Sequence, residues 1–184
     1  MRTRLLLAAS AAMMLLILVG CAGPAPAPTA TTAPLKPTVD LLSNAVYQSD
    51  MTASKTAKLA GGKYEEAAAP GSASKITVML VPASLGLGDL NADAADDAAV
   101  ILASSGGGSG TFISLHAVVS EKGALKDAAW VTLGDRVQVK SVAVSGGIIT
   151  INMVRHGPNE PLCCPTQEAT VKYKLQDGKL VTAP

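Results

Sequence analysis

The 184-residue chain has few aromatic residues: one Phe, one Trp and three Tyr. Platforms that stack on sugar rings are built from aromatic side chains, so this composition argues against a carbohydrate-stacking surface. Trp130 lies in the apolar run 128–133. Large aromatic residues in such runs usually contribute to a core, and we expect the same of Trp130 rather than contact with a ligand.

Charge is scarce and nearly balanced, with 15 Lys and Arg against 14 Asp and Glu and a formal net charge of +1. Removal of Arg2 and Arg4 with an N-terminal leader changes this value to −1, because two positive charges are lost. A near-neutral body lacks the basic field that proteins use to bind phosphate backbones. The composition therefore predicts no nucleic-acid partner.

Groups suited to general-base catalysis are also few, since the chain has only two histidines, His116 and His156. His116 belongs to the alternating run 112–118, which is typical of a residue on one face of a sheet. There is no Gly-x-Ser-x-Gly elbow, and the glycine-rich run 106–110 lacks the lysine of a phosphate loop. We expect a non-enzymatic protein. An envelope hydrolase would require a pocket that joins His116 or His156 to carboxylates.

The N-terminus carries the clearest targeting signal. Arg2 and Arg4 precede an apolar stretch over 5–19, which ends in small residues and is short for a membrane span. The run Leu18-Val19-Gly20-Cys21 resembles the lipobox of bacterial lipoproteins. That resemblance implies cleavage before Cys21 and acylation of its sulfur and new amino group, with the domain on the extracytoplasmic side of the cell membrane or outer envelope. The alternative is an ordinary secretory peptide with an incidental cysteine.

The sequence divides into a signal peptide over 1–20, a linker over 21–39 and a globular domain over 40–184. The linker is rich in Pro, Ala and Thr and has almost no large apolar side chain, so we expect it to be disordered. Its prolines favour an extended backbone at about 3.1 Å per residue, long enough to hold a domain roughly 50 Å from the lipid.

The domain is expected to be mainly β, and α+β at most. A short helical turn is expected within 40–47, capped by Thr38 or Asp40. Glycine-rich turns separate runs with strand composition. The sequence therefore predicts a single antiparallel β domain, either a sandwich or a partly open barrel, with strands over 76–81, 98–103, 111–119, 129–133, 137–144, 148–154 and 170–175.

Oxygen ligands alternate along an acidic loop between two expected strands. Side chains of Asp89, Asn91, Asp93 and Asp97, with the backbone carbonyl of Ala95, would surround a hard cation such as calcium. Over about ten residues the loop resembles the calcium-binding loops of FG-GAP and dockerin modules, which implies a structural calcium site. The alternative is a solvated acidic turn.

Two positions of this loop differ from the calcium-binding pattern. Ala94 stands where those modules have glycine. A Cβ in left-handed backbone costs about 1 kcal/mol. Val100 stands at the twelfth position, so the bidentate glutamate of an EF-hand is missing.

The adjacent Cys163 and Cys164 form the second chemical feature. Export to an oxidising compartment favours a disulfide between them, although neighbouring Cα atoms about 3.8 Å apart strain such a ring. Inert thiols are an equal alternative. A third is a soft-metal site for copper(I) or zinc, formed with His156.

Several motifs together resemble a group of uncharacterised bacterial lipoproteins, over roughly residues 47–181. They are the Gly-Asp-Leu-Asn of the acidic loop, Gly-Ser-Gly-Thr-Phe over 108–112, Leu-Gly-Asp-Arg-Val over 133–137 and His-Gly-Pro over 156–158, which precedes Cys-Cys-Pro. We expect a lipid-anchored cell-envelope protein that engages a surface partner or envelope component and is stabilised by calcium. The alternative is a soft-metal or redox envelope protein that uses His156, Cys163 and Cys164.

Overall fold

Antiparallel strands and one short helix make up the described part of the chain. The computed structural model describes residues 33–161 and 163–184, all within the compact unit Thr31–Pro184. The expected signal peptide and Cys21 lie outside these residues. Within them, no helix has the length and apolarity needed to cross a membrane. The expectation of a mainly β, antiparallel domain is confirmed.

The N-terminal segment forms a small helix and a two-stranded ribbon. Helix α1 (Val39–Ser43) begins after Thr38, whose hydroxyl accepts the Leu41 N–H at 3.2 Å. Thr38 is therefore the cap, and the expected helical turn is confirmed up to Ser43 but not beyond. Tyr47 lies instead in β1 (Val46–Gln48), which pairs with β2 (Thr56–Lys58). Part of the expected linker is attached to the domain, because the Leu35 N–H donates to Ser120 Oγ at 2.7 Å.

A five-stranded sheet lies at the centre of the domain. Its strands follow one another in sequence order, and β5 and β6 are buried along almost their whole length because other layers cover both faces of the sheet. The sheet consists of β3 (Lys63–Ala67), β4 (Lys75–Gly88), β5 (Asp97–Ser105), β6 (Phe112–Glu121) and β7 (Ala124–Asp135).

A four-stranded sheet follows in the C-terminal part of the chain. Its strands alternate between inward apolar and outward polar residues, which is the pattern of a sheet with one solvated face. The spatial order is β11-β10-β9-β8, with β8 (Gln138–Ser145), β9 (Ile148–Arg155), β10 (Gln167–Gln176) and β11 (Lys179–Thr182).

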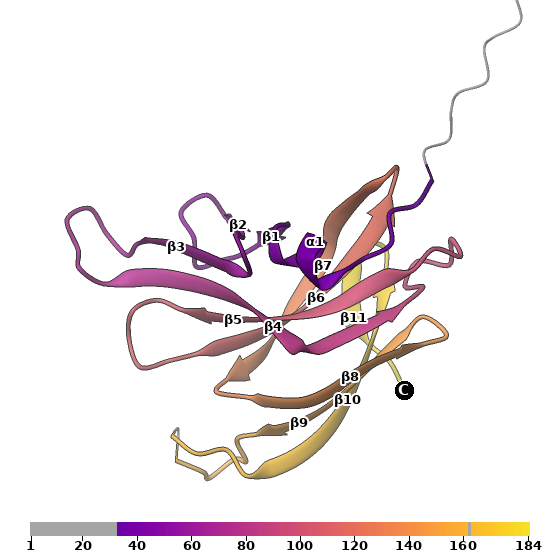
Figure 1. Cartoon of the computed structure of the whole chain (residues 1–184). Coiled ribbons are helices and arrows are strands. Elements are labelled where there is room, and N and C mark those ends of the chain that lie inside the picture. The colour runs from indigo at the N-terminus through magenta and orange to yellow at the C-terminus, as the bar shows by residue number, and fades with distance from the viewer. Residues whose placement is uncertain (1–32, 162) are drawn as a thin grey trace, which may run out of the picture. The chain divides into compact units, whose positions relative to one another are not determined.

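Two apolar cores hold together the layers that Figure 1 shows as ribbons. In the first, Leu42 and Tyr47 of the N-terminal segment pack on one face of the five-stranded sheet, around Val100. In the second, Ile101 on the opposite face packs with Ile149 of the four-stranded sheet. The two sheets thus form a sandwich, with the helix and ribbon as an additional layer.

Strand β4 bends where its pairing with β5 shifts between Leu80 and Leu85. Pro82 lies in this irregular stretch, where its missing N–H costs no ladder hydrogen bond. Beyond the bend β4 approaches β8 so closely that a Cβ on Gly86 would lie 3.0 Å from Val142 Cγ1. Glycine at position 86 therefore permits the close contact between the sheets.

Candidate functional site

A cavity of about 250 Å³ opens beside β1, between the loop that follows β1 and strands β5, β6 and β7. We call it the Trp130 pocket. Its apolar lining includes Met51, Phe112 and Trp130, and its polar lining includes Ser114 and His116. Apolar walls with a few converging polar groups are typical of small-molecule sites, which usually measure roughly 300–1,000 Å³. The Trp130 pocket lies just below that range.

A chain of three polar side chains begins at the wall of this pocket and leads into the protein. Ser114 Oγ lies 3.0 Å from His116 Nε2, and His116 Nδ1 lies 2.9 Å from Asp127 Oδ2. All three are buried, with exposed fractions of 8% for Ser114, 1% for His116 and 3% for the Asp127 side chain. The order of atoms is that of a Ser-His-Asp catalytic triad.

The strands bring these residues together for two local reasons. Ser114 and His116 are two positions apart on β6, so their side chains lie on the same face of the sheet. Strand β7 has a bulge, because Ala117 pairs with Ala129 while Val118 pairs with Asp127. The extra residue, Ala128, reverses the alternation of β7 and turns Asp127 toward the face that carries His116.

The hydrogen bonds of Asp127 determine which nitrogen of His116 carries the proton. A carboxylate accepts hydrogen bonds only. Asp127 Oδ2 already accepts the Gln48 N–H at 2.7 Å. His116 Nδ1 is then the donor to Asp127, which leaves Nε2 as an acceptor for the hydroxyl of Ser114. The remaining oxygen of Asp127, Oδ1, is buried and has no hydrogen-bond partner among the described residues.

Two aromatic rings fix the orientation of the imidazole. The ring of Tyr47 meets it edge-on with centroids 5.5 Å apart, and Trp130 stacks on it at 5.8 Å. Burial and, secondarily, the charge of Asp127 raise the pKa of the Tyr47 phenol far above its ordinary value, so Tyr47 stays neutral.

The acidic loop is closed by its own hydrogen bonds. Asp89 accepts N–H groups of Asn91, Ala92 and Ala94 at 2.7–3.1 Å, and these bonds, led by that from Ala94, lower its pKa. Asp93 accepts the Ala95 N–H at 2.8 Å. The carboxylates of Asp89 and Asp93 therefore stabilise the turn through these backbone hydrogen bonds.

Asp97 points away from the loop and into the domain. Its side chain is fully buried and accepts the N–H groups of Leu90 at 2.9 Å and Ser120 at 2.8 Å, one on each oxygen. Burial raises the pKa of this carboxyl despite the two hydrogen bonds. With both oxygens engaged in this way, Asp97 does not fit the role of a calcium ligand.

The expected calcium ligands are thus only partly brought together. Asp89, Asn91 and Asp93 lie on the exposed loop, whereas Asp97 is turned inward. Across the described residues there is no group of three or more His, Cys, Asp or Glu side chains arranged to hold a metal ion. Ala94, the position that is glycine in the calcium-binding modules, has a positive φ of 65°.

The cysteine pair lies in the connection between β9 and β10. The sulfur atoms of Cys163 and Cys164 lie in close contact, with Cα atoms 3.8 Å apart, and a disulfide between them would remove both thiols from a soft-metal site. Both ring nitrogens of His156 are buried, with no hydrogen-bond partner in the described part of the chain. Glu160 accepts hydrogen bonds from Thr166 and Gly157, which lower its pKa.

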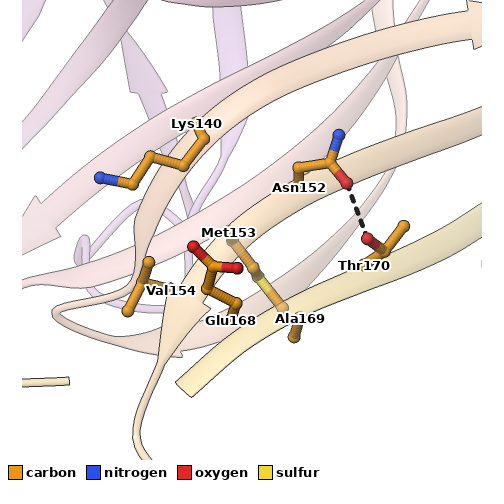
Figure 2. Close-up of a pocket in the computed structure, with 7 residues that line it drawn as sticks. All are labelled: Lys140, Asn152, Met153, Val154, Glu168, Ala169 and Thr170. Atoms are coloured by element: carbon orange, nitrogen blue, oxygen red, sulfur yellow. Dashed lines mark hydrogen bonds between the residues drawn. The ribbon is translucent and has the colours of Figure 1, made fainter. Parts of the chain in front are cut away.

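A second hollow, of about 360 Å³, lies against the outer polar face of the four-stranded sheet (Figure 2). Asn152, one of the lining residues, accepts a hydrogen bond from Thr170 at 2.7 Å, drawn in Figure 2, and donates one to Ser141 at 3.0 Å. These polar groups satisfy one another across the strands, and Lys140 and Glu168 add charged side chains to the lining of the hollow.

Sequence reasoning placed His116 on a sheet face but did not associate it with Ser114 or Asp127. The available signal was the spacing Ser-x-His on a strand and a carboxylate inside the next strand, at Asp127. Trp130 stacks on His116 and lines the pocket, but it is only partly buried and lies outside both apolar cores, so it does not have the core role expected from the sequence. Comparison with known proteins finds no family model, no curated protein and no solved structure that matches the chain.

Proposed function

We propose that this chain is a lipid-anchored protein of the bacterial cell envelope whose β domain binds a small, partly apolar ligand in the Trp130 pocket. The observation that carries the binding role is the pocket itself, where apolar walls meet the Ser114 hydroxyl. The lipobox-like run that ends at Cys21 supports the anchor, and the proline-rich linker would hold the domain away from the lipid.

The pocket suits a ligand with one polar group and a short apolar portion. Met51, Phe112 and Trp130 offer apolar contact on its walls. The Ser114 oxygen, whose proton is donated to His116, keeps lone pairs that can accept a hydrogen bond from a ligand. The ligand class that follows is a small compound that has a hydrogen-bond donor, such as the N–H of a primary amide, and a short alkyl or aryl group.

Binding is tested with butyramide, a small amide that resists hydrolysis. Trp130 is the only tryptophan, so the single indole N–H signal in a ¹⁵N spectrum reports on the pocket directly. We expect a saturable shift of that signal. Ser104→Leu, which adds bulk to the pocket wall, should abolish it, whereas Asn152→Leu at the hollow of Figure 2 should not.

Anchoring is tested separately by expression of the full-length chain in a bacterium. We expect the wild type in the membrane fraction with a fatty-acid label, and Cys21→Ser in the soluble extracytoplasmic fraction without it. Retention of the label by Cys21→Ser would overturn the anchor. An absent indole shift with butyramide would overturn the binding role.

A further inference from the structure

We propose that Ser114 is a nucleophile toward small carboxylic esters bound in the Trp130 pocket, with His116 as its general base and Asp127 as a positioning residue. The inference rests on the proposed binding role of that pocket and goes beyond it, because it assigns a reaction to a second class of compound in the same pocket. It stands on the distances of 3.0 Å from Ser114 Oγ to His116 Nε2 and 2.9 Å from His116 Nδ1 to Asp127 Oδ2.

The direction of the hydrogen bonds matches what the reaction needs. Because Asp127 holds the proton of His116 on Nδ1, the lone pair of Nε2 faces the Ser114 hydroxyl and can remove its proton. A serine hydroxyl is a weak nucleophile until an adjacent base accepts that proton. Ser114 and His116 also line the cavity, so the attacking oxygen and the base both face the space that a substrate would occupy.

The charge of Asp127 is positioned to stabilise the product of proton transfer. Its side chain is 3% exposed, and Oδ1 has no hydrogen-bond partner among the described residues. A buried carboxylate that is only partly satisfied gains most when a positive charge forms beside it. When His116 accepts the serine proton it becomes an imidazolium, and an ion pair with Asp127 results.

The reaction balances with ester and water as the only reactants. Ser114 Oγ bonds to the ester carbonyl carbon as its proton passes to His116 Nε2. The bond from that carbon to the alkoxy oxygen then breaks, and the alcohol leaves with the proton from Nε2. Water next attacks the acyl-serine and gives a proton to Nε2. The carboxylic acid departs as Ser114 recovers its hydroxyl proton.

The size and lining of the pocket limit the substrate class. A cavity of about 250 Å³ holds a short acyl or aryl group but not a polymer chain. Its apolar walls favour an uncharged acyl portion over a sugar or phosphate. Short-chain esters are therefore the class that we assign.

The test uses the full-length chain and a fluorophosphonate probe, which forms a stable bond with an activated serine oxygen. We expect one adduct by mass spectrometry, located at Ser114 by peptide analysis, and none in Ser114→Ala. Ser141→Ala is the control, because Ser141 lies on β8 outside the Trp130 pocket and accepts a hydrogen bond from Asn152 instead of donating one to a histidine. It should label like the wild type.

Asp127→Asn separates a positioning role from a structural one. An amide can donate to His116 Nδ1 and so favour the tautomer with the proton on Nε2, which blocks proton removal from Ser114. We expect labelling to slow by roughly a thousandfold or more while the native Trp130 signal is kept. Hydrolysis of 4-nitrophenyl butyrate should fall in parallel and should be absent in Ser114→Ala.

The outcomes distinguish this inference from the proposed binding role. Butyramide binding without a Ser114 adduct in the wild type overturns the nucleophile and leaves the binding role intact. Labelling that is equal in the wild type and Ser114→Ala, or an adduct at another residue, also overturns it. Failure of butyramide to bind counts against the binding role, whatever the labelling result.

Discussion

Gln48 and Asp127, 79 positions apart in the sequence, are joined by two hydrogen bonds. The Gln48 N–H donates to Asp127 Oδ2 at 2.7 Å, and Gln48 Nε2 donates to the Asp127 carbonyl at 3.1 Å. The first bond shares its acceptor with His116. One buried carboxylate therefore attaches β1 to β7 and also orients the imidazole beside the Trp130 pocket.

Replacement of Asp127 by alanine should destabilise the domain by roughly 2–6 kcal/mol. It leaves the Gln48 N–H and the His116 Nδ1–H buried without an acceptor, and each such loss costs about 1–3 kcal/mol. Urea unfolding followed by Trp130 fluorescence measures the change.

Asp96→Ala is the control for this variant, because Asp96 forms an exposed pair with Lys36 at 3.4 Å. Loss of that pair should change the free energy of unfolding by less than about 0.5 kcal/mol. Equal effects of the two variants would contradict this role of Asp127.

Periodicity in the sequence located most strands of the two larger sheets. The seven expected runs fall within or overlap β4 to β10. The strands that periodicity did not locate are short or polar. One is β3 at the edge of the five-stranded sheet, where the sequence Lys-Tyr-Glu-Glu-Ala has little apolar periodicity. The length of β4 was also missed, because Pro82 and the irregular pairing around it interrupt the strand pattern.

The candidate site was less accessible to sequence reasoning than the fold. The common face of Ser114 and His116 follows from their spacing on a strand. The position of Asp127 does not, because it depends on a bulge at Ala128 that reverses the face of β7. Bulges arise from pairing with a neighbouring strand, so an apolar pattern along one strand does not reveal them.

The acidic loop carries backbone strain at Ala94, where φ is 65°, and glycine there should relieve it. Left-handed backbone is unfavourable for a residue with a Cβ by about 1–2 kcal/mol. Glycine in turn costs about 0.4–1 kcal/mol through the greater entropy of the unfolded chain. We expect Ala94→Gly to stabilise the domain by about 0.5–1 kcal/mol in urea unfolding. Ala143→Gly, in the middle of β8, should instead destabilise the domain by about 0.5–1 kcal/mol. Destabilisation by both variants would argue against strain at Ala94.

Calcium binding remains a prediction for the same loop, now with fewer ligands. Without Asp97, the set is reduced to Asp89, Asn91, Asp93 and the Ala95 carbonyl. Fewer ligand charges weaken a calcium site, so we expect a rise in melting temperature only at millimolar calcium. Excess chelator should reverse the rise, and Asp93→Ala should lack it. A wild type with the same melting temperature in calcium and chelator would identify the loop as a plain acidic turn.

The close contact between Cys163 and Cys164 leads us to predict a disulfide, which alkylation can test. Denatured protein treated with iodoacetamide should gain no label at these two positions until a reductant is added, and two labels afterwards. Peptide mass analysis separates them from Cys21. Labels at both positions without reductant would mean free thiols and would restore the soft-metal alternative with His156.

Tyr47 should make the domain sensitive to alkaline pH. Its hydroxyl donates to the Leu42 carbonyl at 2.9 Å, and burial raises the pKa of the phenol above the ordinary 10.0. The folded state therefore keeps Tyr47 neutral while the unfolded state ionises, so this contribution is complete below about pH 10 and declines above it by roughly 1 kcal/mol per pH unit. Tyr47→Phe should be about 1 kcal/mol less stable than the wild type at pH 8 in urea unfolding, because the Leu42 carbonyl loses its donor. At pH 11 that difference should disappear, since the variant has no phenol to ionise. A constant difference at both pH values would show that Tyr47 titrates alike in the folded and unfolded chains.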